Sequence, residues 1–167
     1  MSQKITLTDD EKDCLQELMN MAYGSATAAI TEILDAFAKL SIPKIQIINA
    51  EELKPYLSDE LNFNEEHLVA LQQINGTLNG ENMFLIDKKS ATNMAQKFGL
   101  TQDEINEDEI CDITLEITNI LSSSTISKLA EDIETCVSFS APSIKIIKSI
   151  DELNNIFINK YQKVIII

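Results

Sequence analysis

Residues 13–20 read DCLQELMN and residues 112–119 read DITLEITN. Both segments follow the pattern D-x-x-x-E-x-x-N, and matching positions lie 99 residues apart. Pro43 and Pro142 keep the same separation. On an α-helix, positions i, i+4 and i+7 share one face, so each segment aligns two carboxylates and one amide. The sequence therefore predicts two long helices that each present the same polar row.

The first long helix has a clear predicted start. Thr8 can accept from the free backbone amides of the first turn, and Glu11 can complete a capping box with it. The acidic residues that follow Thr8 favour the positive end of the helix dipole. Apolar residues recur at helical spacing as far as Phe37. We expect the helix to end before Pro43, because the residue before a proline favours extended backbone.

The segment between the two long helices predicts strands and a short helix. A strand is expected over residues 45–48, and the polar residues 49–66 predict a surface connection with one helical turn. Residues 69–78 and 83–86 then predict a hairpin. Asn79-Gly80 is expected to form its tight turn with positive φ angles.

After the hairpin, Ser90 is expected to cap a short helix that ends at Gly99. The second long helix follows an acidic stretch and continues to about Ile133. Further strands are expected over residues 137–147 and 164–167. The last of these would be an exposed edge unless it pairs.

The order of these segments predicts an α+β fold. We expect a single domain over residues 1–167, made of two intertwined repeats at about residues 8–100 and 107–167. The second repeat has no evident equivalent of the hairpin. A monomer is expected, and pairing of exposed edge strands is the route by which a dimer would form.

Charge and composition exclude several classes of function. The 167 residues include 27 acidic and 13 basic ones, a net charge of −14. This balance argues against nucleic acid and anionic membrane surfaces as partners. No apolar run reaches the length of a membrane span, and the first residues lack the apolar stretch of a signal peptide, so we expect a cytoplasmic protein. His67 is the only histidine, which excludes a His-based metal site or a Ser-His-Asp triad within one chain; it is expected to lie in a loop.

The polar rows favour the positioning of water over covalent chemistry. An asparagine amide offers two donors and an acceptor and can hold a water molecule, while an ionised glutamate can pair with a cation on a partner. Neither group is a strong nucleophile. Phosphoryl transfer is a chemistry in which positioning and charge supply most of the acceleration. The candidate residues are Glu17, Asn20, Glu116 and Asn119, with Asp13 and Asp112 one turn earlier.

Other interpretations of the rows remain open. A single such pair on a helix is usually solvated surface, and a duplicated pair could instead make structural hydrogen bonds from helix to loop. A divalent-cation site is disfavoured. The three side chains of one row span about 10 Å along a straight helix, which is too far to surround one ion.

Residues 17–26 (ELMNMAYGSA) and 116–122 (EITNILS) resemble the two signature helices of the CheC family. These chemotaxis phosphatases hydrolyse the aspartyl phosphate of the response regulator CheY, and their relatives CheX and FliY share the signature. The proline-headed strands and residues 76–80 (GTLNG) extend the resemblance over most of the chain. It implies a pseudo-two-fold fold in which two long helices pack with an antiparallel sheet. Two signature copies favour a CheC-like or FliY-like arrangement.

The resemblance also implies roles for the candidate residues. Asn20 and Asn119 would each align a water for attack on the phosphorus, and Glu17 and Glu116 would each pair with the receiver's lysine. Asp13 and Asp112 would support or dock. The aspartyl phosphate and its Mg²⁺ belong to the receiver, so no cofactor of the chain's own is expected. Gly24 and the following hairpin match the family best, which predicts better support for the first site.

Two functions are compatible with this reading. The first is hydrolysis of a phosphorylated CheY-type receiver in chemotaxis or flagellar control. The alternative is a non-catalytic adaptor that binds such receivers, the deamidase CheD or the flagellar switch. The presence of both Glu and Asn in both copies favours the enzyme.

Overall fold

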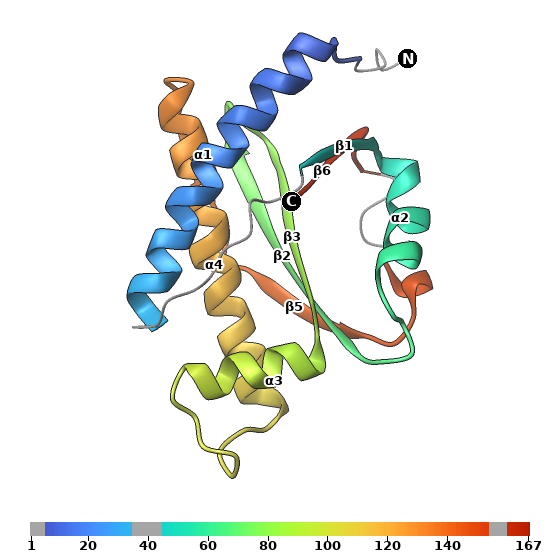
Figure 1. Cartoon of the computed structure of the whole chain (residues 1–167), viewed down its shortest axis with the longest axis vertical. Coiled ribbons are helices and arrows are strands. Elements are labelled where there is room, and N and C mark those ends of the chain that lie inside the picture. Colours follow the sequence, from blue (N-terminus) through green and yellow to red (C-terminus); the bar gives the residue numbers. More distant parts are fainter. Residues whose placement is uncertain (1–5, 35–44, 154–159) are drawn as a thin grey trace.

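The computed structural model describes residues 6–34, 45–153 and 160–167, and in these ranges helices are combined with antiparallel strands (Figure 1). The predicted α+β class is confirmed. The elements are α1 (Asp9–Leu34), β1 (Gln46–Asn49), the 3-10 turn η1 (Ala50–Glu52), α2 (Leu53–Glu60), β2 (His67–Gly76), β3 (Gly80–Asp87), α3 (Lys88–Lys97), α4 (Glu107–Asp132), β4 (Val137–Phe139), β5 (Ser143–Ile147), the 3-10 turn η2 (Ile150–Glu152) and β6 (Lys163–Ile166).

Strand β2 is the centre of the larger sheet. It pairs with β3 along one edge, and its other edge is shared by β4 and β5. Residues 140–142 separate these two short strands. Strands β1 and β6 form a second, two-stranded sheet, so the predicted last strand is paired. All of these pairings are antiparallel, as the resemblance to the CheC family implies.

The alternation of side chains along β2 produces two apolar layers. Leu68 lies in a cluster with Ile110 of α4, whereas Val69 lies in a cluster with Leu53 and Ile147. Figure 1 shows the corresponding arrangement, with α1 and α4 on one side of the sheet and α2, β1 and β6 on the other. Full burial of such side chains stabilises the fold by about 1.5–3 kcal/mol each. The sheet is therefore covered on both faces.

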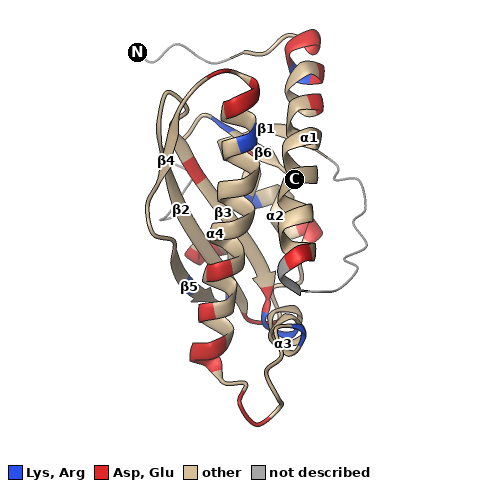
Figure 2. Cartoon of the chain, turned by 90° about the vertical axis from the view of Figure 1, so that its left-hand side faces the viewer, with Lys and Arg blue, Asp and Glu red and all other residues tan. Residues whose placement is uncertain are grey.

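Helices α1 and α4 lie side by side and run in opposite directions (Figures 1 and 2). Ala22 shares an apolar cluster with Leu129, and Ile30 shares one with Leu121. The offset of 99 positions relates Ala22 to Leu121 and Ile30 to Leu129, so the two pairs are equivalent. The centre of the helix pair therefore lies midway between them, near Ala26, which is fully buried. This arrangement is the one a duplication would produce. The boundaries of the two repeats stay a prediction.

The helix starts agree only partly with the sequence-based expectation. The capping box is confirmed, because the backbone amide of Thr8 donates to Glu11 at 2.7 Å and that of Glu11 donates to Thr8 Oγ1 at 3.3 Å. The expected end of this helix and Pro43 lie outside the described residues. Asp87, not Ser90, caps α3, with its carboxylate accepting from the Ser90 amide at 2.8 Å. Gly99 has the expected positive φ, at 94°.

The turn of the hairpin differs from the prediction. Gly80 is the first residue of β3 and pairs with Ile74, so residues 77–79 form the loop. The positive φ in this region belongs to Gly76, at 132°. A Cβ atom there would lie 2.6 Å from the carbonyl oxygen of Cys136, because β4 pairs with this end of β2. The approach of β4 therefore determines where glycine is required.

The expectation of a loop histidine is wrong. His67 is the first residue of β2 and is only 2% exposed. Its ring lies 4.9 Å from that of Phe63, and Nδ1 is hydrogen-bonded to the carbonyl oxygen of Glu65 at 3.0 Å. Upstream of it, η1 and α2 occupy residues 50–60, more helix than the single expected turn. The sequence analysis missed the burial of His67 and the length of this helical segment because both stretches are locally polar. Their burial depends on the second apolar layer of the fold, which a local pattern does not reveal. None of the helices in the described ranges is both long and apolar enough to span a bilayer.

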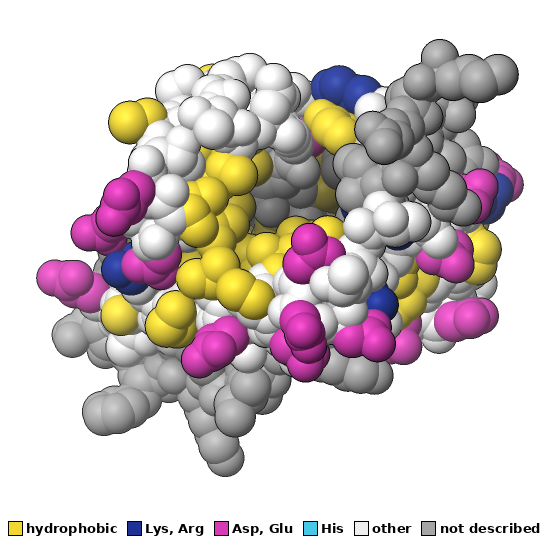
Figure 3. All heavy atoms as spheres, turned by 90° about the horizontal axis from the view of Figure 1, so that it is seen from above, with side chains coloured by type: hydrophobic (Ala, Val, Ile, Leu, Met, Phe, Trp, Pro, Cys, Tyr) yellow, Lys and Arg dark blue, Asp and Glu magenta, His cyan; other side chains and the backbone are white. Residues whose placement is uncertain are grey.

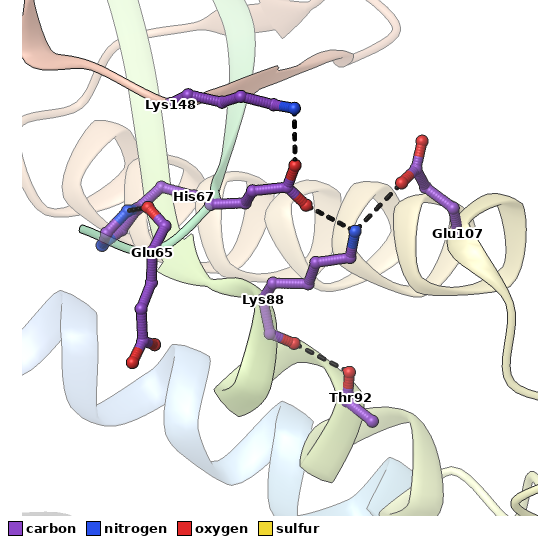
Figure 4. Close-up of polar contacts among 7 residues, drawn as sticks. Glu65, His67, Lys88, Thr92, Glu107 and Lys148 are labelled. Atoms are coloured by element: carbon purple, nitrogen blue, oxygen red, sulfur yellow. Dashed lines mark hydrogen bonds and ion pairs between the residues drawn. The ribbon is translucent and has the colours of Figure 1, made fainter. Parts of the chain in front are cut away.

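A small ion network at the start of α4 joins α3 and α4 to the segments just before β2 and just after β5 (Figure 4). Lys88 Nζ lies 2.6 Å from Glu66 and 3.0 Å from Glu107, and Lys148 Nζ lies 3.0 Å from the other oxygen of Glu66. Hydrogen bonds from Lys88 and then Lys148 hold the pKa of Glu66 below its ordinary value. The partners Glu66 and Glu107 raise the pKa of Lys88. The network is thus complete at neutral pH.

We expect Lys88→Met to lower the melting temperature at pH 7 by a few degrees, since exposed ion pairs contribute modestly. A carboxyl whose pKa is lowered on folding contributes stability above its unfolded pKa and loses it as the pH falls through the folded value. The difference between variant and wild type should therefore shrink on acidification. Melting curves from pH 7 to pH 3 measure this, with exposed Lys89→Met as the control. A difference that stays constant down to pH 3 would contradict the electrostatic role.

Candidate functional site

Each predicted polar row lies on one helix, and most of its side chains face solvent. In α1 the two carboxylates are exposed and the amide is half-buried, and in α4 all three side chains are exposed. The residues are Asp13, Glu17 and Asn20 on α1, and Asp112, Glu116 and Asn119 on α4. The structure therefore exposes both glutamates to solvent, while the two asparagines differ in environment.

The structure does not bring the two rows together. Asn20 and Asn119 each precede the centre of the antiparallel helix pair by six residues, on opposite sides of it. At a rise of 1.5 Å per residue, six residues on each side of the centre place the two asparagines about 18 Å apart along the helix axes. The rows are therefore two separate candidate sites.

The α1 site is formed where an apolar face begins. Met19 and Ala22 are buried against Leu129 of α4, and Asn20 lies at the border of this cluster. Its Oδ1 is buried and makes no hydrogen bond within the part of the chain that the structure describes. A buried acceptor without a partner costs about 1–3 kcal/mol. The buried oxygen of Asn20 is thus without a hydrogen-bond donor among the residues that the structure describes.

The α4 site contains a partner that the sequence analysis missed. Gln72 of β2 is only 1% exposed, and its Nε2 donates to Asn119 Oδ1 at 2.8 Å. The same nitrogen donates to the carbonyl oxygen of Ser140 at 2.9 Å. Ser140 lies in the break between β4 and β5 and also bonds the backbone of Gln73. The signal in the sequence is weak: Gln72 is a polar residue on the helix-facing side of an otherwise apolar strand.

The position of the hairpin reverses one expectation. The hairpin follows the first signature in sequence, which predicted better support for the first site. In the structure, its strand β2 lies against α4, with Leu68 in the cluster of Ile110 and Gln72 bonded to Asn119. The hairpin tip contributes only Leu78 to the α1 cluster. The better supported asparagine is therefore Asn119, because β2 packs against α4, which carries the second signature.

Acidic groups surround both sites. Figure 2 shows Asp and Glu along the start of α1 and at both ends of α4. Seen from the end where α1 begins, carboxylates lie to the left of and below a hollow in which apolar side chains are visible (Figure 3). Such a surface attracts cationic groups of a partner and repels anions.

The thiol beside the second row is not activated. Burial raises the pKa of Cys111, and the nearby carboxylates of Glu107, Asp108 and Asp112 raise it further. A thiolate nucleophile is therefore disfavoured at this position. Among the side chains that the structure describes, no three His, Cys, Asp or Glu residues lie close enough to hold a metal ion.

Comparisons with known proteins relate the chain to chemotaxis and flagellar proteins. Residues 68–158 match the sequence model of a family described as chemotaxis phosphatase CheX. FliY of Thermotoga maritima is similar in structure, with a TM-score of 0.70 and 25% identity over 90% of this chain and 74% of that chain. A comparison with curated protein sequences gave no match.

Two CheX structures share the fold at lower identity. CheX of Desulfovibrio desulfuricans has a TM-score of 0.53 and 15% identity, over 78% of this chain and 78% of that chain. A chain of the CheX–CheY–BeF₃–Mg²⁺ complex of Borrelia burgdorferi has a TM-score of 0.51 and 13% identity, over 83% and 80%. The matched family segment includes α4 with Glu116 and Asn119, and it begins after α1.

Proposed function

Because the chain belongs to the CheX family of chemotaxis phosphatases, with residues 68–158 of 167 matched, we propose that it hydrolyses the aspartyl phosphate of a CheY-type response regulator in chemotaxis or flagellar control. The observation that carries this proposal is the exposed Glu116–Asn119 pair on α4, with the amide of Asn119 held by a buried side chain. The Borrelia complex, in which a CheX is bound to CheY with BeF₃ and Mg²⁺, supports a receiver as the partner.

In the proposed mechanism this chain positions groups and the receiver supplies the reacting ones. Asn119 enters the receiver's site and holds a water in line with the phosphorus, so that attack breaks the bond between phosphorus and the aspartyl oxygen. Glu116 pairs with the receiver's lysine and fixes the docking geometry. Asp112, one turn earlier, supports docking. The Mg²⁺ is part of the receiver, and we propose no cofactor of the chain's own. Positioning of this kind can supply several orders of magnitude in rate.

We propose the same roles for Glu17 and Asn20, with Asp13 supporting docking, and a smaller contribution to turnover. The buried Oδ1 of Asn20 must leave its present position, or the amide must act through its nitrogen alone. Asn119 is exposed, and its Oδ1 accepts a hydrogen bond from Gln72, so its carboxamide is already held in one orientation. We therefore expect Asn119→Ala to lose more of the activity than Asn20→Ala.

The test is the decay of a phosphorylated CheY-type receiver with and without this chain, followed by release of inorganic phosphate. Acceleration that depends on catalytic amounts of the chain supports the proposal. Binding of the BeF₃-activated receiver without any acceleration would overturn it and favour the adaptor role, in which CheD or the flagellar switch are the other partners to test. Absence of both binding and acceleration over the available receivers would reject both.

A further inference from the structure

Gln72 occupies a position where an apolar side chain would be expected. Leu68, Ala70 and Ile74 are the other buried residues on the helix-facing side of β2, and all are apolar. Gln72 is 1% exposed, and its Oε1 is buried without a hydrogen-bond partner among the described residues. An amide with an unpartnered acceptor is unfavourable in a core compared with a leucine of similar volume. Its presence needs a reason beyond packing.

The geometry of its nitrogen gives that reason. Nε2 donates to Asn119 Oδ1 at 2.8 Å and to the Ser140 carbonyl at 2.9 Å. The carbonyl of Ser140 belongs to the break between β4 and β5, so it is fixed by the backbone. Two acceptors, Asn119 Oδ1 and the Ser140 carbonyl oxygen, therefore hold the carboxamide of Gln72. Because Nε2 of Gln72 is a donor, it faces the side-chain oxygen of Asn119 and not the side-chain nitrogen. The NH₂ group of Asn119 must point away from β2, because the two ends of a carboxamide are opposite each other.

We propose that Gln72 is a positioning residue that fixes the rotation of the Asn119 carboxamide and so sets which of its atoms faces the receiver. The inference rests on the function proposed above and deepens it. Without Gln72, the carboxamide can rotate about its last side-chain bond, and oxygen and nitrogen exchange places at the point where water is held. The effect should appear in turnover rather than in docking, since Glu116 does not contact Gln72 through any hydrogen bond between described residues.

Two substitutions of Gln72 distinguish loss of the hydrogen bond to Asn119 from reversal of the Asn119 carboxamide. Gln72→Leu removes the donor at similar volume, and we expect turnover to fall about tenfold. Gln72→Glu places a carboxylate where the donor stood, so Asn119 should turn its NH₂ inward, and we expect a loss on the order of 10²-fold. Affinity for the BeF₃-activated receiver should stay within twofold of wild type in both. Gln73→Leu, the same loss of an amide on the opposite face of β2, is the control and should keep wild-type turnover.

A pH profile distinguishes positioning from a merely structural role. Burial raises the pKa of a carboxyl group, and a protonated Glu at position 72 can again donate to Asn119. The turnover of Gln72→Glu relative to wild type at the same pH should therefore rise as the pH falls, while the ratio for Gln72→Leu stays flat. A flat ratio for Gln72→Glu, or wild-type turnover in both folded variants, would overturn the proposal.

The orientation of Asn119 can also be measured in the wild-type chain without any phosphatase assay. A neutral gadolinium chelate broadens NMR signals of exposed groups, and we expect it to broaden the side-chain NH₂ signals of Asn119 as strongly as those of exposed Asn93. Protection like that of the buried backbone at Thr118 would overturn the proposal. If wild type accelerates no receiver, the proposed function fails, and this measurement still decides whether Gln72 orients Asn119.

Discussion

Replacing Asn20 and Asn119 together by alanine is expected to abolish the acceleration of receiver dephosphorylation. Both amides are proposed to act only by holding water, so their removal should reduce turnover on the order of 10²-fold or more. The fold should be retained. Alanine is the better helix former by roughly half a kcal/mol, and Gln72 keeps its bond to Ser140 when Asn119 is absent. Phosphate release from the phosphorylated receiver measures the loss, and thermal melting checks the fold.

The matched control for this double variant is Asn93→Ala, which removes an exposed asparagine from α3. It should keep wild-type turnover. The two single variants then apportion the activity between α1 and α4, with the larger loss expected at Asn119. A double variant that melts normally and still accelerates decay at the wild-type rate would contradict the proposed mechanism.

Replacing Glu17 and Glu116 together by lysine is expected to weaken receiver binding roughly 10- to 100-fold and to reduce turnover with it. Each change puts a positive charge opposite the receiver's lysine, so an attraction is replaced by a repulsion. Both glutamates are exposed, and the variant should therefore fold normally. Titration with the BeF₃-activated receiver measures the affinity at two salt concentrations, because screening should narrow the difference.

A charge-matched control is available on the same chain. Glu51→Lys with Glu60→Lys changes the net charge by the same amount at exposed positions of η1 and α2, on the other side of the sheet from both rows (Figure 1). If this control weakens binding as much as the Glu17/Glu116 variant, the effect comes from the overall field and not from a specific pair. Unchanged affinity in the Glu17/Glu116 variant would remove the proposed role of both residues.

The two long helices and α3 were predictable because their signals are local. The capping box at Thr8 and Glu11 involves residues three apart, and Gly99 ends α3 through its own backbone conformation. The hairpin was predictable as a pair of arms, yet its turn was not. The glycine with positive φ is Gly76, and the constraint on it comes from Cys136, 60 positions further along the chain. A contact of that range leaves no periodic pattern in the sequence.

The candidate site also combines residues with local signals and a residue that depends on a long-range contact. Helical spacing alone places Glu116 and Asn119 on one exposed face, and the structure has both exposed on α4. Their role in catalysis stays a prediction until the receiver assays are made. Gln72 could not be assigned from spacing, because it reaches Asn119 across 47 positions through the pairing of β2 beneath α4. The only sign of this contact in the sequence is that Gln72 is a polar residue on an otherwise apolar face of its strand.

The sequence by itself determined the two long helices, their matching polar rows and the two arms of the hairpin, since these depend on capping and periodicity within a few positions. The tertiary structure alone decided that the hairpin lies under α4, that β1 pairs with β6 and that His67 is buried. It also made the two rows unequal. Asn119 is held by Gln72, while the oxygen of Asn20 is buried without a partner among the described residues. The physical reason is that burial and long-range hydrogen bonds depend on which segments pack against each other. Two helices with the same local pattern can therefore pack against different neighbours.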